Sequence, residues 1–152
     1  MINNSKLMEQ LNLYYTAWQE CNYVYEAYAK SHGLSFNSLL VISALSEDCE
    51  NCTQKKISQR WMIPKQTVNM ILKDLERNGL VELRPLPSDK RNKVIKLTAA
   101  GKGYAASVIS ELRKVELSAV EEMGMEKMQQ LNENTTLFVE LFRKAGGIDK
   151  ND

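Results

Sequence analysis

The basic residues of this 152-residue chain gather in one segment. Between Thr53 and Thr98 stand eleven Lys and Arg but only four Asp and Glu, a net charge of +7, and the rest of the chain carries −6. A basic block inside an acidic frame is the electrostatic footprint expected of a nucleic-acid-binding module held by a scaffold that does not itself bind. A solvated charged surface is the alternative, which the length of the block disfavours.

Within the block, one helical face carries side chains that suit base recognition. Gln and Asn can pair bidentately with adenine and Lys can contact guanine, whereas Thr more commonly touches phosphate. The side chains expected to meet DNA here are Lys65, Gln66, Thr67, Asn69 and Lys73. For any one of them a solvated helix face is the alternative.

A second group of basic residues lies on the segment SDKRNK. Arg91 stands at the tip of a two-stranded loop, and its guanidinium group is thin enough to enter a minor groove. In A·T-rich DNA the narrowed minor groove concentrates negative potential. Asp89 would be repelled by DNA, so we interpret it as the group that orients Arg91. Lys90 and Lys93 are expected to meet phosphates, with an exposed charged turn as the alternative.

Two short helices joined by a tight turn must position the first group. Thr53 begins one helix, Met62-Ile63-Pro64 forms the turn, and Pro64 suits the first position of the next helix. The spacing of Val68, Ile71, Leu72 and Leu75 turns one face of that helix inward and the basic face outward. This arrangement is typical of a helix-turn-helix.

A β-hairpin must position the second group. Gly79 ends the helix, after which LVELRPLP and VIKLT read as two strands, the second alternating Val94 and Lys96 against Ile95 and Leu97. Long helices precede and follow, one beginning after Asn3 or Asn4 and ending near Gly33, a further one capped by Ser35, and others from Ala99 and after Gly124. The fold class is therefore mainly α with a small β-hairpin wing, a winged helix-turn-helix flanked by terminal helices.

The run GLVELRPLPSDKRNKVIKLTAAG resembles the wing of the MarR family of bacterial transcription regulators, with Asp89, Arg91, Leu97, Thr98 and Gly101 in the matching positions. The resemblance extends from about Leu7 to Gly146. It departs at Leu83, where the family often has a basic residue that Arg84 can replace in contacting DNA.

The resemblance implies an obligate homodimer on a palindromic operator in double-stranded DNA. Residues 1–33 and 99–152 would form the helical dimerisation region and residues 34–98 the winged helix-turn-helix DNA-binding lobe. Apolar residues left over on the first helix agree with a partner surface. We expect a repressor that a small-molecule or redox signal releases; a winged-helix module for protein–protein contact, without specific DNA binding, is the alternative.

Two features suggest where a signal would act. Tyr14, Tyr15, Trp18 and Tyr25 could line a pocket for a small phenolic or aromatic effector, although aromatic residues at helical spacing more often form a core or a dimer interface. Cys49 and Cys52 could form a reversible thiol switch. A zinc site is disfavoured because the only histidine, His32, and the third cysteine, Cys21, stand on another part of the sequence, and each has a plainer role at a helix end or in packing.

Other classes of protein are disfavoured. The chain contains no catalytic constellation and no glycine-rich phosphate loop, so we expect neither enzymatic activity nor a cofactor. No stretch approaches the roughly 18 apolar residues of a membrane span, and MINNSKLMEQ lacks the order of a signal peptide. We therefore expect a cytoplasmic protein that does not associate with membranes.

Overall fold

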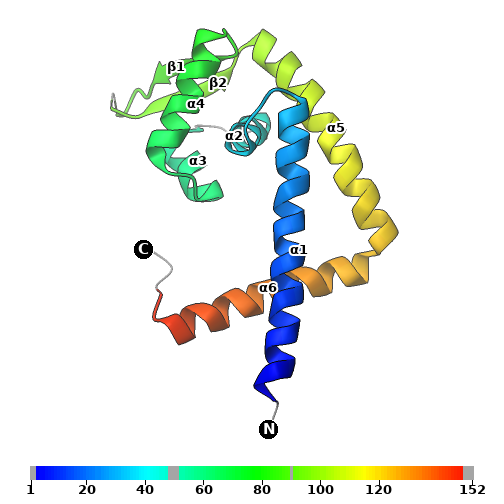
Figure 1. Cartoon of the computed structure of the whole chain (residues 1–152). Coiled ribbons are helices and arrows are strands. Elements are labelled where there is room, and N and C mark those ends of the chain that lie inside the picture. Colours follow the sequence, from blue (N-terminus) through cyan, green and yellow to red (C-terminus); the bar gives the residue numbers. More distant parts are fainter. Residues whose placement is uncertain (1–2, 48–51, 90, 149–152) are drawn as a thin grey trace. The chain divides into compact units, whose positions relative to one another are not determined.

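The computed structural model describes residues 3–47, 52–89 and 91–148, within which six helices and one antiparallel hairpin form (Figure 1). The elements are α1 (Asn4–Ser31), α2 (Phe36–Ser46), α3 (Gln54–Trp61), α4 (Lys65–Arg77), β1 (Val81–Pro85), β2 (Lys93–Leu97), α5 (Ala99–Met123) and α6 (Met125–Gly146). The chain divides into two compact units, Met1–Ser110 and Glu111–Asp152, and α5 crosses the boundary between them. The predicted fold class, helical with a β-hairpin wing, is confirmed.

Helix α2 is the centre of the first unit. It contacts α1, α3, α4 and β2, and its residues from Val41 to Leu45 are all buried. Ser35 begins it as predicted, because the side-chain oxygen of Ser35 accepts a hydrogen bond from the Ser38 amide at 3.0 Å. A helix buried around most of its circumference can hold several neighbours in fixed positions, and α2 does this for the α3–α4 pair.

The ends of α1 follow the capping pattern expected from the sequence. The Asn3 side chain accepts from the Ser5 amide at 3.1 Å, and Gly33 takes the left-handed conformation (φ +70°) just after the C-terminal cap, His32. The interpretation of His32 as a helix-end residue is confirmed. The last turns of α1 are tied to α5, since the Tyr28 hydroxyl donates a 2.6 Å hydrogen bond to the Val108 carbonyl.

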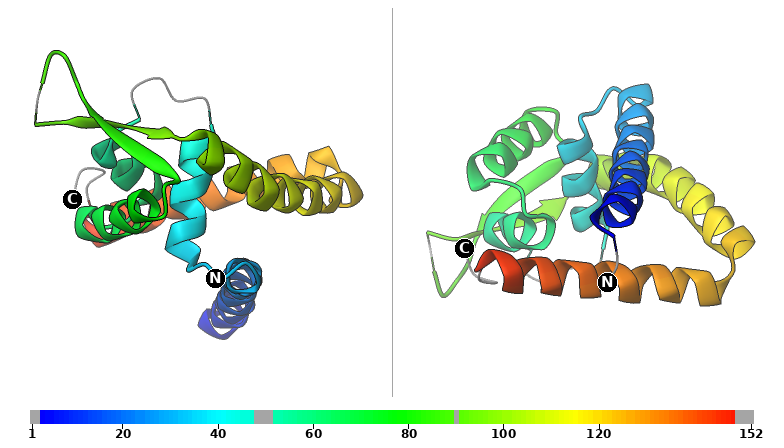
Figure 2. Two further views of the ribbon diagram at one scale, coloured as in Figure 1. Left: turned by 90° about the horizontal axis from the view of Figure 1, so that it is seen from above. Right: turned by 60° about the horizontal axis from the view of Figure 1, so that its bottom comes forward.

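The wing is the two-stranded sheet, in which Val81 pairs with Leu97 and Pro85 with Lys93 (Figure 2). The expected alternation along β2 is wrong at one position, because Val94 and Ile95 are both buried. The segment just before α3 lies beside this part of β2. The Ile95 amide donates to the Cys52 carbonyl at 2.8 Å and Thr53 bridges Val94, so the edge of β2 that faces away from β1 is also covered.

The second unit contains the rest of α5 and all of α6. Helix α6 has no buried side chain among its residues, although Leu131, Phe138 and Phe142 recur along it at helical spacing. None of the described helices is both long and apolar enough to cross a membrane. The apolar stripe of α6 is left exposed.

Candidate nucleic-acid interface

The turn between α3 and α4 is held by its own hydrogen bonds. The Ile63 amide donates to the Ser58 carbonyl at 3.2 Å, and the Ser58 hydroxyl donates to the Ile63 carbonyl at 2.6 Å. The Gln54 side chain reaches across to donate to the Lys65 carbonyl at 2.7 Å, which ties the start of α3 to the start of α4. These hydrogen bonds hold the angle between α3 and α4.

Pro64 occupies a different position from the one expected. It is the N-cap of α4, not its first helical residue, because its ψ of 136° is extended while its carbonyl accepts from the Val68 amide at 3.0 Å. Pro64 has no side-chain oxygen to satisfy the first amides of the helix. The N-terminus of α4 therefore presents amide donors and the positive end of the helix dipole, an arrangement that favours an anion.

Helix α4 separates its two faces as the spacing predicted. Val68, Ile71, Leu72 and Leu75 are all buried. On the outward face the side chains of Lys65, Gln66 and Lys73 are exposed and those of Thr67 and Asn69 are half-buried. The structure thus brings all five predicted α4 residues onto one helix within the first unit.

Asp89 organises the wing tip. One of its carboxylate oxygens accepts from the backbone amide of Arg91 at 3.0 Å, and the other accepts from the Asn92 side-chain amide at 2.9 Å. The backbone amide of Asn92 also donates to the backbone carbonyl of Asp89 at 3.2 Å. Asp89 thus shapes the backbone that carries Arg91, and Arg91 itself is exposed.

The other basic residues of the wing differ in how they are held. Arg84 forms an ion pair with Glu82 at 2.6 Å on β1, and part of its charge is thereby neutralised within the chain. Lys93 is exposed at the start of β2. Lys90 lies outside the described residues.

A junction that the sequence analysis missed connects the wing to both helices that flank it. The Thr98 hydroxyl donates to the Gly79 carbonyl at 2.6 Å and accepts from the Gly101 amide at 3.0 Å, and the Thr98 amide donates to the Leu80 carbonyl at 3.0 Å. A Cβ atom at Gly101 would lie only 1.8 Å from the Leu80 carbonyl oxygen. Only glycine allows this approach of α5 to the start of the wing.

Three further exposed side chains of the lobe were not singled out from the sequence. Lys55 and Lys56 lie in the first turn of α3, and Met70 lies on the outward face of α4. The signal for the two lysines was available, because they belong to the basic block. The helical spacing places Met70 on the outward stripe with Lys65, Gln66, Asn69 and Lys73, but no contact with DNA was expected of it.

The predicted effector residues all lie on α1. Tyr15 and Trp18 are exposed, Trp18 at 57%, and the Tyr15 ring lies 6.1 Å from that of Tyr14. Tyr25 packs against Phe36 of α2, with ring centroids 5.8 Å apart. The exposed rings agree with an uncovered interface as well as with one wall of a pocket, so the effector site stays a prediction.

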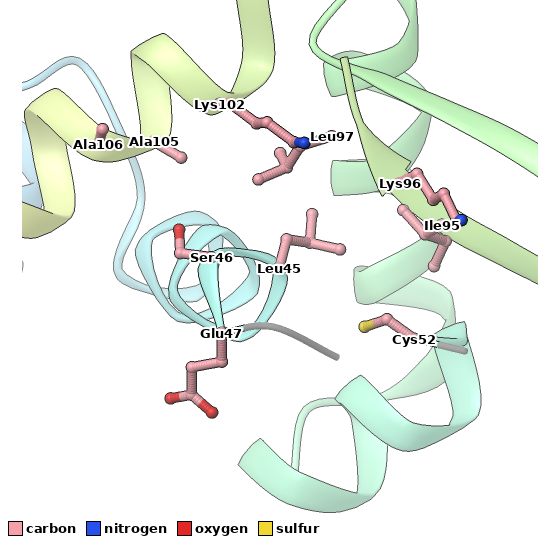
Figure 3. A pocket seen from close by; sticks show the side chains of 10 residues that line it. All are labelled: Leu45, Ser46, Glu47, Cys52, Ile95, Lys96, Leu97, Lys102, Ala105 and Ala106. Atoms are coloured by element: carbon pink, nitrogen blue, oxygen red, sulfur yellow. The ribbon is translucent and has the colours of Figure 1, made fainter. Parts of the chain in front are cut away.

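A pocket of about 480 Å³ lies elsewhere in the first unit, between the end of α2, strand β2 and the first turns of α5 (Figure 3). Its walls are Leu45, Ser46, Glu47, Cys52, Ile95, Lys96, Leu97, Lys102, Ala105 and Ala106. The side chain of Lys102 extends from α5 toward Leu97 (Figure 3). None of the predicted aromatic effector residues belongs to these walls.

The predicted thiol pair is only half described. Cys52 is buried, at 4% exposure, and lines the pocket, while Cys49 lies outside the described residues. Cys21, which was expected to pack on the apolar stripe of α1, is exposed in this chain. Within the described ranges, no cluster of three or more His, Cys, Asp or Glu residues could hold a metal ion.

Comparisons with known proteins agree with this geometry. A model of the MarR family matches residues 32–92. The chain is 31% identical over 141 residues to the transcriptional regulator SarZ of Staphylococcus epidermidis, covering 91% of this chain and 92% of that protein.

Solved structures extend the likeness to the whole fold. A MarR family regulator from Neisseria meningitidis superposes with a TM-score of 0.79 at 26% identity, over 91% of this chain and 96% of that one. MepR of Staphylococcus aureus, solved in complex with DNA, superposes with a TM-score of 0.69 at 20% identity, over 86% of this chain and 96% of that one.

Proposed function

The chain belongs to the MarR family of transcriptional regulators, whose members are not enzymes, and on this premise we propose that it binds a palindromic DNA operator as a homodimer. Helix α4 then enters the major groove, and the wing tip enters the neighbouring minor groove. The observation that carries the proposal is the outward face of α4, where polar and basic side chains stand opposite a fully buried apolar face. Any surface helix has a polar face, but this one carries the amide and lysine side chains that DNA recognition uses.

On α4, the proposed roles follow from side-chain chemistry. Gln66 and Asn69 pair with adenine edges, and Lys65 and Lys73 contact guanine or phosphate. Thr67, in the first turn, contacts a phosphate together with the uncapped amides of the helix. Lys55 and Lys56 at the start of α3 add phosphate contacts.

On the wing, Arg91 is the residue proposed to enter the minor groove, and Asp89 fixes the backbone that presents it. Lys90 and Lys93 meet phosphates on either side. Arg84 contributes less than an unpaired arginine would, because Glu82 shares its charge. Specificity on the wing therefore depends mainly on groove width and potential, which Arg91 senses.

The proposed division of labour assigns residues 34–98 to DNA binding and residues 1–33 and 99–152 to dimerisation. It is supported by the uncovered apolar side chains of α1 and α6, among them Leu13, Trp18, Leu131 and Phe142. A two-fold dimer presents two α4 helices to the two halves of a palindrome.

We further propose that the protein is a repressor released by a signal. A phenolic or aromatic effector would bind near Tyr15, Trp18 and Tyr25, and oxidation of Cys49 and Cys52 is the redox counterpart. By linkage, a signal that lowers affinity for the operator must itself bind less tightly when operator is present. The arrangement requires no cofactor and no metal.

Salt titration of binding tests the proposal. Full-length protein is mixed with DNA fragments selected from the source genome, and affinity is measured by fluorescence anisotropy. A protein that makes about 6–10 phosphate contacts loses roughly 10³ to 10⁵ in affinity between 50 and 200 mM salt. A flat response, or no binding to any fragment, would favour a module for protein–protein contact.

A further inference from the structure

Met70 is an apolar side chain on a face that is otherwise polar. It is 63% exposed, whereas Val68, Ile71, Leu72 and Leu75, the other large apolar residues of α4, are at most 9% exposed. The core of the lobe therefore does not use this side chain. A single exposed apolar residue is ordinary on a protein surface, so its neighbours decide whether it has a role.

Several of its neighbours are side chains proposed to contact bases; Asp74, four residues after it, is another neighbour and is paired with Arg77 at 3.1 Å. Gln66 precedes Met70 by four residues and Lys73 follows it by three, the spacings that bring side chains together on a helix surface. Asn69 adjoins it in the sequence. Met70 thus lies in the middle of the outward face and not at its margin, and it must approach base edges whenever its neighbours do.

We propose that Met70 reads thymine, by contact of its thioether end with the 5-methyl group that thymine alone presents in the major groove. This inference rests on the proposed function. Gln66 and Asn69 suit adenine, and every adenine in a duplex places a thymine methyl in the same groove on the opposite strand. An apolar side chain beside two adenine-reading amides therefore has an apolar partner within the same few base pairs.

Methionine suits this contact better than a branched residue does. It has an unbranched, flexible side chain with a polarisable sulfur, which lets it adapt its terminal methyl to a small apolar target. Burial of one methyl group contributes about as much as one buried methylene, so loss of the thymine methyl should weaken binding roughly threefold to fivefold per half-site.

The test removes that methyl without changing any hydrogen bond. An operator is first selected from random-sequence duplexes with the full-length protein, and each thymine in it is then replaced singly by uracil. Affinities are measured at one fixed salt concentration. For the wild type, we expect one uracil position per half-site to weaken binding threefold to fivefold.

Two variants test whether Met70 is responsible for the loss of affinity on replacement of thymine by uracil. Met70→Ala should bind the thymine and uracil operators equally well, because it has lost the partner of the methyl group. Met62→Ala is the matched control, since Met62 is 82% exposed in the turn before α4 and lies off the outward face. It should keep the full sensitivity to uracil, and thermal melting should show that both variants are folded.

The outcomes are distinct. Failure to bind any duplex would overturn the proposed function and this inference with it. Tight, salt-dependent binding that no uracil replacement weakens would overturn the inference alone. So would a Met70→Ala protein that remains as sensitive to uracil as the wild type.

Discussion

Asp89 places a negative charge on the part of the molecule that we propose to meet DNA. Its contacts explain why such a charge is tolerated there. One carboxylate accepts from the Arg91 amide and from the Asn92 side chain, so the turn that presents Arg91 depends on it. Repulsion from phosphates and organisation of the tip are therefore separable effects of one side chain.

Two substitutions separate them. Asp89→Asn removes the charge and the oxygen that accepts from the Asn92 side chain, but it keeps an oxygen that can accept from the Arg91 amide. Because the bond to Arg91 shapes the tip and the repulsion from phosphates is gone, we expect affinity for DNA equal to or above that of the wild type. Asp89→Ala removes the acceptor as well and should weaken binding by about 1 kcal/mol relative to Asp89→Asn. Fluorescence anisotropy at fixed salt measures both, and equal affinities for the two variants would contradict the positioning role.

Arg91 itself is expected to carry the largest single contribution on the wing. Arg91→Ala should weaken specific operator binding by about 1–3 kcal/mol while leaving the melting temperature unchanged, because the side chain is exposed. Arg113→Ala is the control, since it removes the same charge from α5 outside the lobe, where Arg113 pairs with Glu116 at 3.0 Å. A folded Arg91→Ala protein with wild-type affinity would exclude the wing tip from recognition.

Between elements, the junction of β1, β2 and α5 decides where the wing stands. Thr98 joins Gly79 to Gly101, and the missing side chain of Gly101 lets the helix touch the Leu80 carbonyl. The Leu80 atoms that a Cβ would meet belong to the backbone. They cannot rotate away as a flexible side chain could, so any side chain at position 101 must displace α5 or the start of the wing.

A pair of glycine substitutions on α5 tests that argument. Gly101→Ala should destabilise the fold by about 3 kcal/mol or more, because its Cβ would overlap the Leu80 carbonyl. Gly103→Ala, two residues on, meets nothing within 4 Å and should stabilise the protein by about 0.5–1 kcal/mol, the usual gain for this change in a helix. Urea unfolding measures both, and similar effects of the two changes would contradict the close approach.

Local signals explain which elements the sequence could predict. Ser35, Thr53 and Gly79 mark helix boundaries through contacts with residues a few positions away, and all three stand where they were expected. The burial of Val94 could not be predicted from local signals. Val94 pairs with Thr53, which belongs to a distant part of the chain.

In the candidate site, too, the features that depend on local contacts could be predicted and those that depend on distant contacts could not. The faces of α4 follow from helical spacing alone. The contacts of Asp89 are local, and the sequence predicted its role as the orienting residue; the acceptor turned out to serve the backbone of Arg91. The ion pair between Glu82 and Arg84 is also local, since residues two apart on a strand share a face. The need for glycine at position 101, in contrast, depends on which atoms approach in space.

For the whole molecule, the uncovered apolar side chains of α6 call for a partner. Leu131, Phe138 and Phe142 recur at spacings of seven and four, which places them on one side of the helix. Thr136 and Glu140 fall on the opposite side. We propose that the apolar side is buried in the dimer, and DNA affinity then depends on it, because two linked lobes bind two half-sites with an avidity that one lobe lacks.

Phe142→Glu should therefore shift the protein from dimer to monomer in sedimentation velocity, since a charge buried in an apolar interface has no partner. Binding to a full palindrome should weaken about a hundredfold or more, the usual scale for loss of bivalency. Thr136→Glu adds the same charge on the opposite side and should leave both assembly and affinity unchanged. A Phe142→Glu protein that still sediments as a tight dimer would assign association to other surfaces, with the exposed aromatic residues of α1 as the next to be changed.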